Sequence, residues 1–123
     1  MVKDIAYSAY PAKDVPALRK FYEDALGIKF GEPFVQDGVE KYAEAQVGNS
    51  WFAVMTTDWL ETIPSGGISF EVDDIRATID RVRQQRGGSE FEDVHDIPSC
   101  FISSFRDPEG NKVTLHQSKG AAV

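Results

Sequence analysis

The spacing of hydrophobic residues predicts a first helix between residues 15 and 26. Apolar side chains recur there at intervals of three and four, which places them on one face of an α-helix. Asp14 is positioned as the N-cap, and Gly27 is positioned to end the helix in the left-handed conformation. The residues of this apolar stripe are Val15, Leu18, Phe21, Tyr22, Ala25 and Leu26.

A second helix is predicted by a shorter apolar stripe on Ile75, Ile79 and Val82. Either of the two aspartates that precede Ile75 is suited to cap its amino end. The Gly-Gly pair at 87–88 is suited to end it.

The remaining segments read as β-strands, because they are rich in β-branched and aromatic residues and are separated by turn sequences. Residues 107–110, Asp-Pro-Glu-Gly, are typical of a turn, since proline suits its second position and glycine a left-handed residue. The predicted strands cover residues 3–10, 28–35, 39–47 and 50–57 in the first half and 68–72, 89–95, 99–106 and 111–117 in the second.

The order of strand, helix and three strands occurs twice along the chain. The two capping residues Asp14 and Asp74 are 60 positions apart, and such repetition is typical of a unit that cannot bury its sheet face alone. We therefore expect an α+β fold with two βαβββ modules in one domain, residues 1–123. The modules are expected at 1–60 and 66–118, followed by a loose tail at 119–123.

The charge balance narrows the range of partners. The 123 residues include 13 Lys and Arg against 20 Asp and Glu, which gives a net charge of −7. A nucleic acid or an anionic membrane surface would be repelled by that field, so we expect neither as a partner. A small molecule or a second copy of the chain is favoured instead.

Other features favour a cytoplasmic protein. The longest unbroken apolar run, Trp51 to Met55, is five residues long, which is too short to cross a bilayer. Cys100 is the one cysteine of the chain, so the sequence offers neither a disulfide framework nor a thiolate metal cluster. The first residues do not resemble a signal peptide.

Three motifs resemble those of the vicinal oxygen chelate superfamily and occur in the same order. Residues 14–27 are similar to its D-x6-F-Y-x3-L-G signature, residues 70–74 to its F-x-V-D-D motif, and residues 107–111 to its D-P-[DE]-G-N hairpin. The resemblance covers nearly the whole chain. This superfamily includes glyoxalase I, extradiol dioxygenases, fosfomycin-modifying enzymes and bleomycin-sequestering proteins.

The resemblance implies the glyoxalase/bleomycin resistance-like fold, in which paired βαβββ modules curl a mixed sheet around a cavity. In the enzymes, four strand positions bring His, Gln or Glu to one divalent metal, which chelates the substrate. These positions fall at Tyr7, at Val54 or Met55, at Gly66 or Gly67, and at Thr114. They offer none of the usual imidazole or carboxylate ligands. We therefore expect no metal cofactor, although His116 leaves open a divalent ion held through a replaced ligand.

His116, Glu71 and Tyr7 are the candidates for acid–base chemistry. His116 follows Thr114 by two residues and so shares its face of the last strand, where it can serve as base, acid or hydrogen-bond partner. The alternative is a histidine near the surface or a dimer contact. Glu71 shares a face with Ser69 and would act as a base if desolvated; the alternative is a solvated glutamate at the rim.

Aromatic residues are the candidates for contact with a flat ligand. Tyr7 and Trp51 are favoured over Tyr42 and Trp59, whereas Phe21, Tyr22 and Phe70 are expected in the core. The predicted ligand-binding residues are Tyr7, Trp51, Ser69, Glu71, Thr114 and His116.

Three functions are compatible with these features. The first is metal-free binding of a small, partly aromatic molecule in a sheet-lined cavity by a homodimer. The second is an enzyme, either a glyoxalase-like lyase, an isomerase or a dioxygenase, whose metal site is non-standard or absent. The third is a structural or interaction protein whose cavity is filled by side chains, and no cavity above roughly 300 Å³ would favour it.

Overall fold

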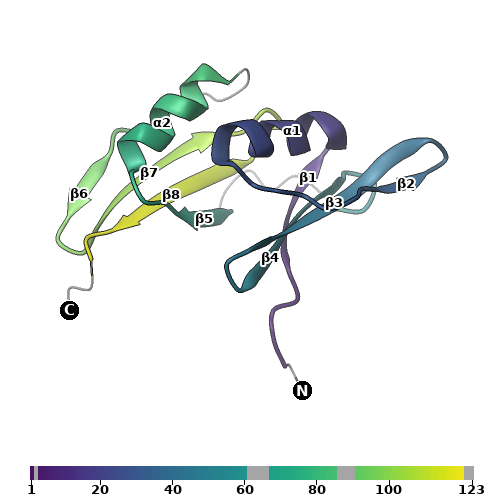
Figure 1. Ribbon diagram of the computed structural model, residues 1–123, viewed down its shortest axis with the longest axis horizontal. Coiled ribbons are helices and arrows are strands. Elements are labelled where there is room, and N and C mark those ends of the chain that lie inside the picture. Colours follow the sequence, from purple (N-terminus) through teal and green to yellow (C-terminus); the bar gives the residue numbers. More distant parts are fainter. Residues whose placement is uncertain (2, 61–66, 86–90, 121–123) are drawn as a thin grey trace. The chain divides into compact units, whose positions relative to one another are not determined.

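The computed structural model describes residues 1, 3–60, 67–85 and 91–120. The chain divides into two units, Met1–Thr62 and Ile63–Val123. In the described residues, each unit has one helix and one four-stranded mixed sheet, and its strands and helix follow the order βαβββ (Figure 1). The predicted α+β class and the repeated order are therefore confirmed.

The first unit builds its sheet in the order β1-β4-β3-β2, with β1 parallel to β4 and the other pairs antiparallel. Its elements are β1 (Ser8–Ala12), α1 (Val15–Leu26), β2 (Phe34–Gln36), β3 (Val39–Val47) and β4 (Ser50–Thr56).

The second unit repeats this arrangement in the order β5-β8-β7-β6, with β5 parallel to β8. Its elements are β5 (Ile68–Glu71), α2 (Ile75–Gln84), β6 (His95–Ile97), β7 (Cys100–Arg106) and β8 (Lys112–Ser118).

Both helices begin at the predicted aspartates. The Ala17 N–H donates to Asp14 Oδ1 at 3.0 Å, and the Ala77 N–H donates to Asp74 Oδ1 at 3.1 Å. Gly27 ends α1 with φ of 69°, and its N–H donates to the Glu23 carbonyl at 3.1 Å. The first helix therefore has both of its predicted ends.

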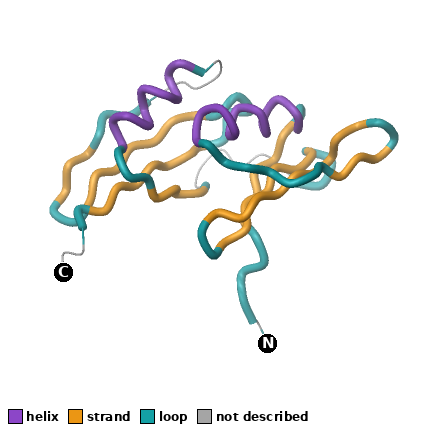
Figure 2. The backbone as a smooth tube through the Cα atoms, in the orientation of Figure 1, coloured by secondary structure: helices purple, strands orange, loops and turns teal. Residues whose placement is uncertain are grey.

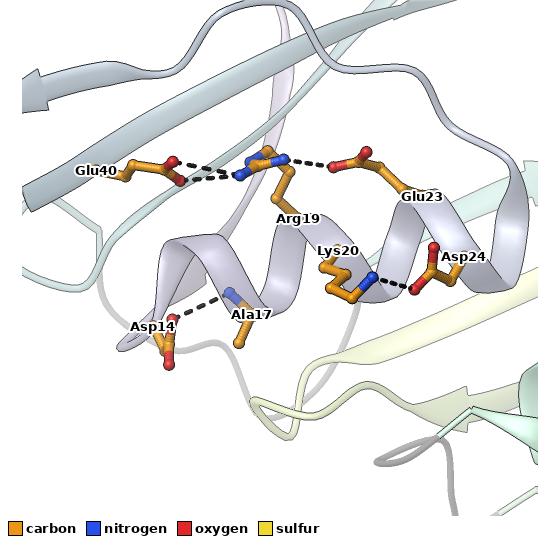
Figure 3. Close-up of polar contacts among 7 residues, drawn as sticks. All are labelled: Asp14, Ala17, Arg19, Lys20, Glu23, Asp24 and Glu40. Carbon is orange, nitrogen blue, oxygen red and sulfur yellow. Dashed lines mark hydrogen bonds and ion pairs between the residues drawn. The ribbon is translucent and has the colours of Figure 1, made fainter.

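The exposed side of α1 is tied to its own sheet by an arginine (Figure 3). Arg19 contacts Glu23 one turn away at 2.6 Å and Glu40 of β3 at 3.3 Å. Lys20 pairs with Asp24 at 3.1 Å. Such partly exposed ion pairs contribute little stability, so packing of the apolar stripe holds the helix in place.

The inner face of α1 packs against aromatic residues of the first sheet. The Tyr22 ring lies 5.1 Å from the Phe52 ring of β4 and 6.2 Å from the Tyr10 ring of β1. All three side chains are buried. Phe21 is buried as well, so its predicted core position is confirmed.

The second helix covers one face of its own sheet in the same way. Ile75, Ile79 and Val82 of α2 are buried, as are Phe105 and Leu115 of β7 and β8. Gln117 fixes the start of the helix on β8, because its Oε1 accepts the Ile75 N–H at 2.8 Å. Phe70 is also buried, as predicted.

The turn between β7 and β8 is held by a buried aspartate. Asp107 Oδ1 accepts the N–H groups of Glu109 and Asn111, each at 2.9 Å, and Oδ2 accepts the Asn111 side-chain amide at 3.0 Å. Gly110 has φ of 86°, which a side chain would disfavour. The predicted turn is confirmed.

Two strands of the first unit begin later than predicted. Residues 3–7 are a loop (Figure 2), and pairing of β1 with β4 starts only at Ser8, opposite Phe52. Residues 28–33 are also a loop, which runs from the end of α1 to β2 (Figure 2). Gly31 and Pro33 interrupt this segment, since glycine weakens a strand and proline lacks the N–H for pairing.

The strand predicted at 89–95 is wrong in position, because β6 begins only at His95. In the residues before it, the Ser103 hydroxyl donates to the Glu92 carbonyl at 2.7 Å, which occupies an acceptor that strand pairing would use. Residues 89 and 90 and the predicted helix end at 87–88 lie outside the described residues. Helix α2 has its last residue at Gln84.

The tail predicted to be loose from residue 119 starts with an anchored lysine. The Lys119 N–H donates to the Ser99 carbonyl at 3.1 Å. Its ammonium contacts Asp96 and lies 4.6 Å from the centre of the Phe101 ring. Residues 121–123 lie outside the described part of the chain.

Candidate functional site

Each sheet has a helix-covered face and an opposite face, which we call the open face of that unit. Side chains alternate between the two faces along a strand. In β4, Phe52 contacts α1, so Val54 also points to the helix side and Trp51, Ala53 and Met55 belong to the open face. In β8, Leu115 is on the helix side, so Thr114 and His116 belong to the open face of the second unit.

Four predicted residues come together on the open face of the second unit. The parallel pairing of β5 and β8 places Ser69 opposite Thr114 and Glu71 opposite His116. Partners in register share a face, so two hydroxyl groups lie beside a carboxylate and an imidazole. Alternation along each strand predicts that Ser69 shares a face with Glu71, and Thr114 with His116. That the two pairs lie side by side depends on the pairing of β5 with β8.

Glu71 and His116 are in direct contact. Oε1 of Glu71 lies 2.5 Å from Nδ1 of His116, and Oε2 accepts the Ser118 N–H at 2.8 Å. The backbone bond from Ser118 first, and the bond from His116 second, lower the pKa of the Glu71 carboxyl below its ordinary value. The Glu71 side chain is 58% exposed and that of His116 35% exposed, so the pair is open to a ligand.

The same row of the sheet contains both histidines of the chain. On β7, Ile102 is in register with His116 on one side and with His95 of β6 on the other. The row across β6, β7, β8 and β5 is therefore His95, Ile102, His116 and Glu71. Ile102 was not among the predicted site residues, and His95 was predicted at the end of a strand over 89–95; the pairing of β6 with β7 brings both into this row.

The open face of the first unit carries an aromatic cluster. The Tyr7 and Tyr42 rings meet edge to face, with centres 6.2 Å apart. Trp51 lies on this face and is 42% exposed. The Tyr42 hydroxyl donates to Glu44 at 2.7 Å, and burial together with this bond raises the pKa of Tyr42, so the phenol stays neutral. Tyr42 therefore belongs with the two favoured aromatic residues.

Trp59, the remaining aromatic candidate, contacts Phe34 of β2, with ring centres 6.1 Å apart, and Phe34 is in register with Tyr42. The predicted site residues thus divide between the units: Tyr7 and Trp51 lie in the first and the four polar residues in the second. Cys100 is buried.

The internal repeat shows which residue of the first unit corresponds to Thr114, the predicted fourth metal position. Pro11 of β1 pairs with Met55 of β4 as Glu71 of β5 pairs with His116 of β8, and Ala9 pairs with Ala53 as Ser69 pairs with Thr114. The residue that corresponds to Thr114 is therefore Ala53, next to the predicted Val54 or Met55.

The side chains at these positions do not fit a divalent metal. They supply a phenol at Tyr7, a methyl group at Ala53, no side chain at Gly67 and a hydroxyl at Thr114, whereas such a site needs several imidazole or carboxylate ligands. Among the described residues, no three His, Cys, Asp or Glu side chains are grouped so as to hold a metal. Gly66 lies outside the described residues.

Two of the surface hollows in the described residues lie beside the helices. One, of about 670 Å³, lies beside the start of α1 and includes Lys13, Glu40 and Asp58 in its lining. The other, of about 350 Å³, lies beside α2 and includes Arg83 and Asp93. Neither is lined by a predicted site residue.

No helix in the described part of the chain is long and apolar enough to cross a membrane.

Comparison with solved structures shows the same fold in proteins of low sequence identity. TnmS3, an antibiotic binding protein from Streptomyces sp. CB03234, matches with a TM-score of 0.72 and 21% identity over 96% of this chain and 98% of that one. Lactoylglutathione lyase from Agrobacterium tumefaciens matches with a TM-score of 0.69 and 20% identity over 99% and 98% of the two chains.

Sequence comparison identifies the family. A glyoxylase-like domain-containing protein from Didymella fabae is 35% identical in an alignment of 112 residues that covers 82% of this chain and 83% of that protein. The model of the Glyoxalase/Bleomycin resistance protein/Dioxygenase superfamily matches residues 4–115. The chain therefore belongs to the Glyoxalase/Bleomycin resistance protein/Dioxygenase superfamily.

Proposed function

We propose that the protein binds a small organic molecule on the open face of the second unit, without a divalent metal. The observation that carries this proposal is the arrangement of Ser69, Thr114, Glu71 and His116 as two registered pairs on one face. A ligand-binding surface needs a few polar groups fixed in position, and the Glu71–His116 contact of 2.5 Å fixes two of them.

The chemistry of the four metal positions supports binding without a metal. The chain has lost the ligands that the enzymes of the superfamily use, and Thr114, at one of these positions, offers a hydroxyl that can donate or accept a hydrogen bond. The open face is thus equipped to recognise polar atoms of an organic molecule directly. TnmS3, which shares the fold, is described as an antibiotic binding protein, and its description agrees with this kind of function.

As part of this proposal, the protein acts as a homodimer. Light scattering coupled to size-exclusion chromatography measures that state: a mass of twice 13.7 kDa supports a dimer, and a mass of 13.7 kDa excludes it at the concentration tested.

The experiment is a screen of small amphipathic molecules against ¹⁵N-labelled protein in EDTA, read from its amide NMR signals. We expect at least one compound to shift the amides of Ser69, Glu71, Thr114 and His116 together. Thr114→Val, which keeps the shape of the side chain and removes the hydroxyl, is expected to weaken binding about fivefold, the effect of one lost hydrogen bond.

The matched control is a hydroxyl removed from the helix-covered side of the same unit. Thr78 lies on α2, where its hydroxyl donates to the Asp74 carbonyl, so Thr78→Val should leave affinity unchanged. A screen in which no compound shifts the four amides, or in which compounds act only when a metal is added, would overturn the proposal.

A further inference from the structure

Resting on the proposed function, we infer that Glu71 holds His116 in the tautomer whose Nε2 is a free hydrogen-bond acceptor. We infer also that the ligand is a neutral molecule that donates an O–H or N–H group from an apolar body, of which a phenol is the simplest example. Glu71 is thus a positioning residue, and His116 is the residue that meets the ligand.

The tautomer follows from the chemistry of the contact. An ionised carboxylate can only accept hydrogen bonds, and both Glu71 oxygens are occupied, Oε1 by His116 Nδ1 and Oε2 by the Ser118 N–H. The His116 Nδ1 must therefore carry the proton. In a neutral imidazole the other nitrogen, Nε2, is then an acceptor, as in the histidines that a carboxylate orients at other sites. The lowered pKa of Glu71 agrees with an ionised partner.

The surroundings of His116 hold the imidazole in one position. The His116 carbonyl accepts the Val72 N–H at 2.9 Å, so the backbones on both sides of the pair are tied together. Both Glu71 oxygens are contacted from β8, Oε1 by the His116 imidazole and Oε2 by the Ser118 N–H. The imidazole therefore meets a carboxylate that is itself fixed, which is the condition for one tautomer to dominate.

The neighbours of the pair indicate the kind of molecule that it would accept. Ile102 of β7 is in register with His116 on the side away from β5, so an apolar side chain flanks the imidazole opposite Glu71. The hydroxyl groups of Ser69 and Thr114 lie one pair further along the strands, roughly 7 Å away. A ligand with an apolar ring and one donor group matches this surface, with the ring against Ile102 and the donor at Nε2.

The first test reads the tautomer directly, without any ligand. The chain has two histidines, so NMR of protein labelled with ¹⁵N-histidine gives two sets of ring signals, which His95→Asn assigns. At a pH where both imidazoles are neutral, we expect His116 to carry its proton on Nδ1. In Glu71→Gln, whose amide can donate as well as accept, we expect the Nε2–H form to gain population while His95 is unchanged.

The result that overturns the inference is a wild-type His116 with its proton on Nε2, or a tautomer that Glu71→Gln leaves unaltered. Amide spectra of each variant show whether it is folded. Glu71→Asp provides a second test. Its shorter side chain reaches less far toward His116 Nδ1, so the population of the Nε2–H form should rise in this variant as well.

The second test uses para-cresol and 4-methylanisole, which differ in the O–H group. We expect para-cresol to shift the His116 Nε2 signal and to bind about five- to tenfold more tightly, the effect of one hydrogen bond. That difference should vanish in His116→Phe and persist in His95→Asn. Equal affinities of the two probes in the wild-type protein would overturn the assignment of the ligand class.

The two proposals fail separately. If other compounds shift the amides of the open face but para-cresol and 4-methylanisole bind alike, the binding function stands and the donor class is wrong. If no compound shifts those amides, the binding function is wrong, whereas the tautomer measured without ligand still decides the role of Glu71.

Discussion

Glu71 and His116 are 45 residues apart in the sequence, yet Oε1 of one lies 2.5 Å from Nδ1 of the other. The parallel pairing of β5 with β8 creates this contact, because it sets the two residues in register. A strand pair formed one residue out of register would turn one of the two side chains to the helix-covered face. The candidate site therefore depends on the long-range pairing of the second sheet.

The acid stability of the protein should depend on Glu71. Its pKa is lowered in the folded state, by the Ser118 N–H first and His116 second, so the unfolded chain binds a proton at higher pH than the folded one. Stability from this group is present above the ordinary pKa of glutamate, about 4.3, and is lost as the pH falls through the lower folded value. We expect the difference in unfolding free energy between wild type and Glu71→Gln to shrink between pH 7 and pH 3.5.

Urea unfolding at several pH values measures this difference. Glu32→Gln is the matched control, because Glu32 is an exposed glutamate of the first unit, and its difference from wild type should stay nearly constant. A difference for Glu71→Gln that is independent of pH would contradict the account of the contact.

The start of α2 should depend on Asp74 and not on the aspartate before it. Asp74 Oδ1 accepts the Ala77 N–H, and loss of such a cap costs about 1 kcal/mol. We expect Asp74→Ala to lower the free energy of unfolding by about that amount, as measured in urea. The neighbouring Asp73→Ala, which removes an equal charge from an exposed position, should change it by less than about 0.5 kcal/mol.

A side chain at residue 27 should destabilise the end of α1. Gly27 has φ of 69° and a Cβ placed there would meet no atom within 4 Å, so the cost of Gly27→Ala comes from the backbone conformation alone. We expect a loss of about 1 kcal/mol. Gly31→Ala, where the nearest atom is 3.8 Å away, is the control; equal thermal stability of both variants would show that the helix ends elsewhere.

Local sequence was sufficient for the features that depend on neighbouring residues. The caps Asp14 and Asp74, the left-handed Gly27 and the turn at 107–110 could all be predicted, because each is fixed by side chains within a few positions. The start of β1 could not, since it depends on long-range pairing with β4, which starts at Ser8 and Phe52.

The candidate site was predictable only in part, for the same reason. Alternation along a strand was enough to place Thr114 and His116 on one face of their strand, and Ser69 and Glu71 on one face of theirs. The contact between Glu71 and His116 requires the register of two strands, and the place of Ile102 beside them requires that of a third. The resemblance predicted metal positions at Tyr7 and Thr114, whereas the correspondence of Ala53 with Thr114 requires the register of both sheets.

Added metals should not stabilise the protein. A ligand at 100 times its dissociation constant raises the unfolding free energy by about 2.7 kcal/mol, which shifts the melting temperature of a domain of this size by several degrees. We expect no such shift when Ni²⁺, Zn²⁺, Mn²⁺ or Fe²⁺ is added to chelator-treated protein. If one metal raises the melting temperature and His116→Ala abolishes this rise, His116 is a ligand of that metal.

The central claim, that the open face of the second unit binds an organic molecule without a metal, is tested most directly by one affinity. The dissociation constant of a compound from the screen is measured by calorimetry in EDTA and again with each metal in excess. We predict the same value in every condition. Binding that appears only with a metal, or that strengthens tenfold or more when a metal is added, would contradict the claim.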